Sequence, residues 1–132
     1  MAFSLSQLGQ VSLTVDDIDA AEKFYGETLG LRKLFRFGDL LFFDCAGVRL
    51  YIQKSNTEPF VPVSSVLYFR TPDIGVAVQQ LKAKGVEFID PPHLVAPMED
   101  HDLWMAFFKD SAGNTLALMH EAPKGFTPGA ET

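Results

Sequence analysis

The chain carries the same helix-forming pattern twice, once near its start and once past its middle. The matching positions lie at one fixed offset: Asp17, Ile18, Ala21 and Tyr25 correspond to Asp73, Ile74, Ala77 and Leu81. Asp16 or Asp17 can cap the first helix, and Thr71 followed by Pro72 can start the second. Gly30 and Gly85 stand where each helix should end in a left-handed residue. A repeat of this length constrains the fold strongly, because both copies must form the same supersecondary unit.

The residues around each predicted helix repeat as well. Short apolar segments bounded by turn residues predict strands over residues 10–15, 34–37, 40–44 and 48–53 in the first copy, and over 66–70, 86–89, 103–109 and 115–120 in the second. Both copies therefore read strand, helix and three strands, and we expect them to pack on a common core. We predict a single domain over residues 1–132, with one module over about 8–54, a polar linker over 55–63, a second module over about 64–122 and a loose tail over 123–132.

Composition excludes several classes of protein. A chain of 132 residues has the size of about one domain, and its 47% hydrophobic content is too high for a disordered protein. The net charge of −6 disfavours binding to nucleic acid, and no apolar run approaches the ~20 residues that a membrane span needs. The single cysteine, Cys45, can form neither an internal disulfide nor a zinc finger. We expect a cytoplasmic protein with no nucleic-acid or membrane partner, since the N-terminus also lacks the pattern of a secretory signal.

The paired units, the Asp-Ile…Phe-Tyr…Leu-Gly pattern of residues 17–30, and the aromatic strand that runs into Lys109–Asn114 resemble the vicinal oxygen chelate superfamily. This superfamily contains glyoxalase I, extradiol dioxygenases and bleomycin-resistance proteins, and the resemblance covers residues 8–121. It implies an α+β fold in which two βαβββ modules pack into one curved mixed sheet that forms a cup. It also implies a small organic ligand in the cup and, frequently, a homodimer.

The resemblance also indicates where a metal would bind. Metal enzymes of the family take ligands from the opening and closing strands of each unit, which map here onto Gln10, Tyr51, Val66 and Ala117. A divalent cation needs charged or strongly donating ligands, whereas this set offers one amide, one phenol and two hydrocarbons. We therefore expect no metal and no other cofactor. A metal-dependent lyase, isomerase or dioxygenase with non-standard ligands, such as His93, Glu99 and His101, stays open as the alternative.

Residues that alternate with these positions should share the face of the cup. Together with Trp104, a candidate rim aromatic, they give the candidate ligand-binding residues Gln10, Ser12, Tyr51, Gln53, Tyr68, Trp104 and Met119. Filling of the core is an equally good interpretation of Tyr51, Tyr68, Trp104 and Met119. The net charge favours a neutral or cationic ligand, whereas Arg49 and Arg70 on the same face would favour a carboxylate, so the sign of the ligand stays open.

Residues 91–102 form a predicted loop that is long for a hairpin and rich in histidine and carboxylate. Within it His101, between Asp100 and Asp102, is a weak candidate for a catalytic proton carrier, although a solvated acidic loop is the more common interpretation. His120 should point away from the cup and be exposed or at a subunit contact. The sequence thus favours a small-molecule binding protein or a cofactor-free enzyme. A purely structural module is a third possibility.

Overall fold

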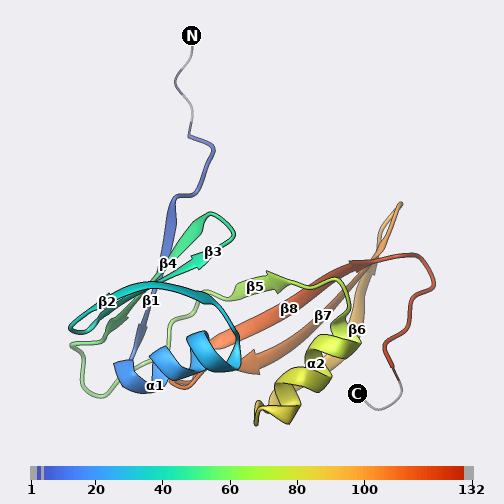
Figure 1. Cartoon of the computed structure of the whole chain (residues 1–132). Coiled ribbons are helices and arrows are strands. Elements are labelled where there is room, and N and C mark those ends of the chain that lie inside the picture. Colours follow the sequence, from blue (N-terminus) through green and yellow to red (C-terminus); the bar gives the residue numbers. More distant parts are fainter. Residues whose placement is uncertain (1–2, 4, 130–132) are drawn as a thin grey trace. The chain divides into compact units, whose positions relative to one another are not determined.

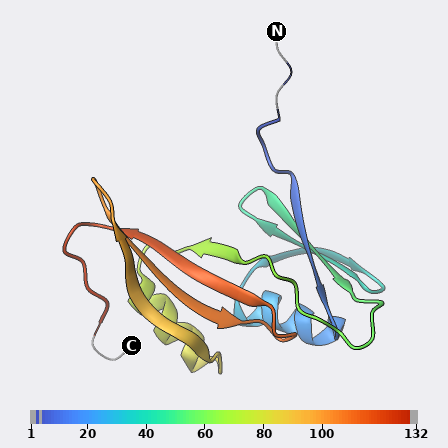
Figure 2. The ribbon, with the colours of Figure 1, turned by 180° about the vertical axis from the view of Figure 1, so that it is seen from behind.

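The computed structural model describes residues 3 and 5–129, and the chain folds as two compact units that divide between Val61 and Pro62 (Figure 1; from behind, Figure 2). Each unit contains one opening strand, one helical segment and three further strands. Hydrogen bonds join the strands into two four-stranded sheets, one in each unit. The α+β class and the two βαβββ modules are therefore confirmed, whereas the strands form two four-stranded sheets in place of the one mixed sheet that the resemblance implies.

The first unit contains a sheet with one parallel and two antiparallel pairings. Its elements are β1 (Gln10–Val15), α1 (Ile18–Lys23), a π-helical turn (Phe24–Thr28), β2 (Arg32–Phe37), β3 (Leu40–Cys45) and β4 (Val48–Lys54). The strand order is β1-β4-β3-β2, with β1 parallel to β4. We call this sheet 1.

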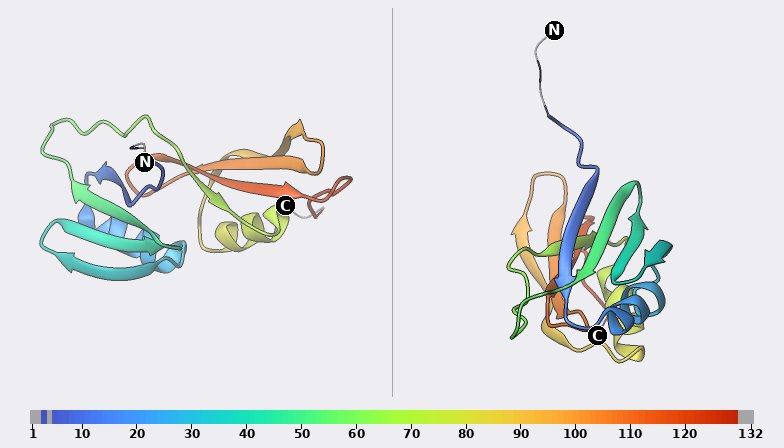
Figure 3. Two further views of the ribbon diagram at one scale, coloured as in Figure 1. Left: turned by 90° about the horizontal axis from the view of Figure 1, so that it is seen from above. Right: turned by 90° about the vertical axis from the view of Figure 1, so that its left-hand side faces the viewer.

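Helix α1 packs on one face of sheet 1, against β3 and β4 (Figure 3). Asp17 caps it, because Oδ1 accepts the backbone N–H groups of Asp19 and Ala20 at 3.0 and 3.1 Å. The buried stripe Ile18, Ala21 and Tyr25 covers the apolar side of the sheet. The last turn is a π-helix, which the sequence did not indicate because periods of 3.6 and about 4.4 residues cannot be separated over a single turn.

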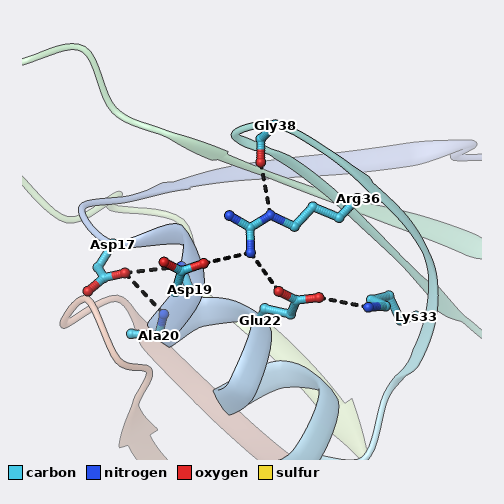
Figure 4. Close-up of polar contacts among 7 residues, drawn as sticks. All are labelled: Asp17, Asp19, Ala20, Glu22, Lys33, Arg36 and Gly38. Atoms are coloured by element: carbon cyan, nitrogen blue, oxygen red, sulfur yellow. Dashed lines mark hydrogen bonds and ion pairs between the residues drawn. The ribbon is translucent and has the colours of Figure 1, made fainter.

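Ion pairs attach α1 to the edge strand β2 (Figure 4). Arg36 Nη1 lies 2.7 Å from Asp19 and 2.6 Å from Glu22, and its Nε donates to the carbonyl of Gly38. Lys33 Nζ donates to the second oxygen of Glu22 at 2.7 Å. These bonds, first from Lys33 and then from Arg36, lower the pKa of the Glu22 carboxyl.

The second unit repeats this arrangement. Its elements are β5 (Leu67–Arg70), α2 (Ile74–Ala83), β6 (Phe88–Pro97), β7 (Asp102–Lys109) and β8 (Thr115–Ala122). The order is β5-β8-β7-β6, with β5 parallel to β8, and α2 packs against β6, β7 and β8. We call this sheet 2.

The ends of α2 differ in part from the sequence prediction. Asp73, rather than Thr71, caps the helix, because its carboxylate reaches the N–H of Val76 at 3.1 Å. Thr71 instead bonds the backbone of Asp73 through Oγ1. Gly30 and Gly85 follow the two helical segments with φ of 78° and 92°, so the predicted left-handed ends are confirmed.

The predicted loop over residues 91–102 is wrong. Strand β6 continues to Pro97, so that residues 98–101 alone connect it to β7. Pro91 and Pro92 fit within this strand because β6 is an edge strand that pairs only with β7, and its register shifts at three places along its length.

Residues 123–129 contact sheet 2 of their own unit, whereas their composition predicts a loose tail. The ring of Phe126 lies edge-on to Trp104 at 6.0 Å and to His120 at 4.7 Å. Lys124 Nζ bonds Asp102 Oδ1 and the carbonyl of Met98, each at 2.8 Å. Residues 130–132 of the predicted tail lie outside the described residues. Over the described part of the chain, no helix is both long and apolar enough to cross a membrane.

Candidate functional site

The face of sheet 1 opposite α1 collects most of the candidate residues of the first unit. The strand register places its side chains in three rows across β1, β4, β3 and β2: Gln10, Arg49, Asp44 and Arg32; Ser12, Tyr51, Phe42 and Phe35; and Thr14, Gln53, Leu40 and Phe37. We call these twelve residues the helix-free face. It brings together four of the predicted ligand-binding residues, namely Gln10, Ser12, Tyr51 and Gln53.

The middle row is a continuous aromatic stack. The rings of Phe35 and Phe42 lie 4.5 Å apart at 23°, and those of Phe42 and Tyr51 lie 4.7 Å apart at 7°. The spacing matches that of neighbouring strands, so the stack runs across the sheet. Phe35 and Phe42 were not among the predicted site residues. The Ala46-Gly47 turn could have placed Phe42, because it pairs Cys45 with Val48 and hence Phe42 with Tyr51.

The polar row beside the stack contains an arginine that has no acidic partner within the described part of the chain. Arg49 Nε donates to Gln10 Oε1 at 2.8 Å, and its guanidinium carbon lies 5.7 Å from the centre of the Phe42 ring. Asp44, its cross-strand neighbour, instead accepts the N–H of Gly47 at 3.1 Å and lies 3.9 Å from Arg32. Each of the other three arginines forms an ion pair, so within the described residues Arg49 alone lacks a carboxylate within 4.0 Å.

The other end of the stack is bounded by polar groups. The hydroxyl of Tyr51 donates to Gln53 Oε1 at 3.0 Å, which fixes the ring along β4. Ser12 is the residue of β1 in register with Tyr51, and it is exposed. A short polar side chain therefore stands beside the last ring of the stack.

Of the three predicted ligand-binding residues in the second unit, sheet 2 places two, Tyr68 and Met119, on one face. Tyr68 pairs with Ala117, and Arg70 pairs with Met119, on the face opposite α2. Tyr68 also contacts Phe107 edge-on at 6.0 Å. Arg70 forms an ion pair with Glu121, so its charge is balanced within the unit.

Trp104 lies on the other face of sheet 2. It pairs with His120 in the β7–β8 register and packs against Phe126, away from Tyr68 and Met119. Its indole Nε1 is buried and has no hydrogen-bond partner among the described residues. The residue therefore packs with the C-terminal segment rather than with the other candidate ligand-binding residues.

His101 has carboxylates on both sides. Its Nδ1 lies 2.7 Å from Asp100 Oδ1, and its Nε2 lies 3.7 Å from Glu121 Oε2. The bond to His101 lowers the pKa of the Asp100 carboxyl. Asp102 turns to Lys124 instead, which lowers the pKa of that carboxyl, so the predicted Asp-His-Asp arrangement is replaced by Asp100, His101 and Glu121.

His120 is buried, with 5% of its surface exposed, so the prediction of an exposed side chain is wrong. Its Nδ1 accepts the backbone N–H of Ile74 at 3.3 Å, and Phe126 covers the ring. Together with Arg70, Thr71, Pro72, Glu121 and Pro123, it lines an open depression of about 440 Å³. His120 lies on the face of sheet 2 away from Tyr68, as the alternation along the strand predicts. The segment that buries it, around Phe126, belongs to the part of the chain predicted to be a loose tail.

The four positions that correspond to metal ligands do not fit a divalent cation. Ala117 is fully buried, and Val66 offers only a hydrocarbon side chain. Gln10 Oε1 is already bonded to a guanidinium, and Tyr51 donates its hydroxyl proton to Gln53. Neutral oxygens beside an arginine are poor ligands for a cation. Among the described residues there is also no group of three or more His, Cys, Asp or Glu side chains placed to hold a metal ion.

The family model for the Glyoxalase/Bleomycin resistance protein/Dioxygenase superfamily matches residues 7–118. The chain belongs to this superfamily. The resemblance seen in the repeated motifs is thereby confirmed. No curated protein is significantly similar to the chain in sequence.

Solved structures agree with this membership at the level of the fold. The chain is similar to a lactoylglutathione lyase from Agrobacterium tumefaciens, with a TM-score of 0.71, 22% identity, and coverage of 92% of this chain and 98% of that one. It is similar to a glyoxalase/bleomycin resistance protein/dioxygenase from Nocardioides, with a TM-score of 0.69 and 20% identity, over 97% of this chain and 91% of that one. It is also similar to an integron cassette protein from V. cholerae, with a TM-score of 0.74 and 19% identity, over 92% of this chain and 100% of that one. At these identities the likeness shows the fold alone.

Proposed function

We propose that this superfamily member binds a small organic molecule on the helix-free face of sheet 1 and does so without a metal ion. The observation that carries the proposal is the stack of Phe35, Phe42 and Tyr51 beside the polar pair Gln10 and Arg49. Aromatic surface with a few oriented polar groups is the usual composition of a small-molecule site. Burial of apolar ligand surface against these rings would supply about 25 cal/mol per Å².

The polar groups of the face would orient the ligand rather than hold a cation. Gln53 is held by Tyr51, and Gln10 is held by Arg49, so both amides have fixed positions. Fixed donors and acceptors lose little conformational entropy when a ligand binds. The same contacts oppose a metal, because the guanidinium of Arg49 lies against the one amide oxygen that a metal would need.

Binding is favoured over catalysis by the titratable groups present on the face. These are Arg32, Asp44, Arg49 and Tyr51, and in the one carboxylate, that of Asp44, Oδ1 accepts the N–H of Gly47 and Oδ2 lies 3.9 Å from Arg32. A general base needs a free acceptor within reach of the ligand. His101, the candidate proton carrier, is not one of the twelve residues of this face, and its Nδ1 is bonded to Asp100.

Metal content and ligand binding of one preparation test the proposal. Protein purified without chelators is analysed for Fe, Ni, Zn and Mn, and its melting temperature is then screened against small aromatic compounds before and after treatment with a chelator. We expect substoichiometric metal and an equal ligand-induced rise in melting temperature in both samples. Near-stoichiometric metal whose removal abolishes binding would overturn the proposal and favour a metal-dependent lyase, isomerase or dioxygenase. No stabilising compound at all would favour a structural module.

A homodimer, which the family resemblance implies, stays a prediction. The molar mass in solution, measured by light scattering, tests it directly.

A further inference from the structure

We infer that the ligand is a planar aromatic carboxylate whose ring stacks on Tyr51 above Ser12 and whose carboxylate pairs with Arg49. This inference rests on the proposed function, because it names the chemical class of the molecule bound at the helix-free face. It assigns a negative charge to the ligand, a sign that the sequence leaves open.

The aromatic stack stops one strand before the edge of the sheet. Phe35 on β2, Phe42 on β3 and Tyr51 on β4 each present a ring in the same row, at separations of 4.5 and 4.7 Å. The near-parallel rings of Phe42 and Tyr51 leave the second face of Tyr51 turned towards β1. An unsaturated planar group at that face would extend the stack by one ring.

Ser12 leaves the place for that ring open. It is the residue of β1 in register with Tyr51, it is exposed, and its side chain is the shortest in the row. In place of a fourth aromatic side chain there is one hydroxyl, which can donate a hydrogen bond to a ligand. Because β1 is an edge strand, no further strand of sheet 1 lies beyond it.

Arg49 supplies the charge for a carboxylate. Its Nε donates to Gln10 on β1, the strand of Ser12, and its guanidinium carbon lies 5.7 Å from the centre of the Phe42 ring on β3. It has no carboxylate within 4.0 Å among the described side chains, whereas Arg32, Arg36 and Arg70 each have one. Arginine recognises carboxylates through paired N–H donors, and among the described residues the Nη groups of Arg49 carry no bond to an acid. This local cation outweighs the net charge of −6, because the charges of distant exposed groups are screened within about 10 Å.

Calorimetric titration with three matched probes tests the inference: naphthoate, naphthamide and naphthylmethylammonium. They share one ring system and differ in charge. We expect naphthoate to bind at least about tenfold more tightly than naphthamide, and the cation to bind most weakly. The preference for naphthoate should shrink as salt is added. Equal affinities for all three probes would overturn the inference and leave the proposed function standing, whereas no binding of any probe would count against both.

Substitutions then locate the probe. Arg49→Met should reduce the affinity for naphthoate about tenfold and leave naphthamide almost unchanged. Lys23→Met is the control, because Lys23 is exposed on α1, which packs on the opposite face of sheet 1, and its replacement should have little effect. Ser12→Phe should abolish binding by filling the place of the fourth ring, whereas Ser12→Ala should retain it. Naphthoate affinity that Ser12→Phe and Arg49→Met both leave unchanged, in variants that melt cooperatively, would contradict the inference.

Discussion

The imidazole of His120 accepts the backbone N–H of Ile74 over 3.3 Å, so the last strand of the second unit holds the first turn of α2. The ring is buried and lies edge-on to Phe126 at 4.7 Å. One side chain therefore joins the helix, the sheet and the C-terminal segment of that unit.

Replacing His120 with Ala should lower the free energy of unfolding by about 2–4 kcal/mol, because it leaves the Ile74 N–H unpaired and opens a cavity beneath Phe126. Urea denaturation followed by circular dichroism measures the change. His93→Ala is the control, since His93 is exposed and should change stability by less than about 0.5 kcal/mol. Equal effects of the two substitutions would show that the contact with Ile74 contributes nothing.

Glu22→Gln should destabilise the first unit in a pH-dependent manner, by less than about 1 kcal/mol at neutral pH. The bonds from Lys33 and Arg36 lower the pKa of Glu22 in the folded state. The stabilisation is therefore present above the ordinary value of ~4.3 and is lost as the pH falls through the lowered one. Thermal melts of the two proteins should differ at pH ~7 and converge in acid. Glu87→Gln, at an exposed position, is the control, and a difference that persists in strong acid would contradict this account.

Asn114→Ala should be among the most damaging changes in the second unit, at about 2–4 kcal/mol. The side chain is 1% exposed; Nδ2 donates to Asp110 at 3.0 Å and Oδ1 accepts the N–H of Val63 at 2.7 Å. The loss of these bonds leaves buried polar groups without partners. Chemical denaturation is the measurement, and Ser111→Ala in the same turn, at an exposed position, should be nearly neutral. A small effect of Asn114→Ala would mean that water replaces both bonds.

Phe126→Ala should shift the fluorescence emission of Trp104 to longer wavelength. Trp104 is the single tryptophan of the chain, and Phe126 contacts its ring at 6.0 Å. Removing Phe126 admits water to an indole N–H that is buried in the native structure. Ile89→Ala, at an exposed position of β6, should leave the emission unchanged. An unshifted spectrum for Phe126→Ala would show that the C-terminal segment does not cover Trp104 in solution.

The sequence predicts the modules well because the signals for them are local. Asp17 and Gly30 bound the first helical segment as expected, and the alternation in each strand places Tyr51 on the same face of the sheet as Ser12. Capping groups, left-handed glycines and a period of two residues depend on neighbours in the chain. Such features can be read without knowing the tertiary structure.

The sequence predictions are wrong where the structure of a segment depends on contacts with residues far away in the chain. Pro91 and Pro92 resemble a loop, yet they lie in β6 because an edge strand bonds on one side only. His120 is covered by Phe126, a contact that alternation along β8 cannot reveal.

The candidate site shows the same division. Ser12, Tyr51 and Gln53 follow from alternation, whereas Phe35 joins the stack only because the register between β2 and β3 shifts after Lys33. Among the described residues Arg49 lacks an acidic partner because the carboxylate of its neighbour Asp44 bonds Gly47 and lies near Arg32 instead. Irregular register and the choice of partner by a charged group are tertiary properties.

The most direct test of metal-independent binding is a nuclear magnetic resonance titration of isotope-labelled, chelator-treated protein with naphthoate. We predict saturable shifts in the backbone amides of Ser12, Tyr51 and their neighbours on β1 and β4, with no metal added. Shifts that require a divalent cation, or that cluster in the second unit and leave β1 and β4 unchanged, would contradict the account.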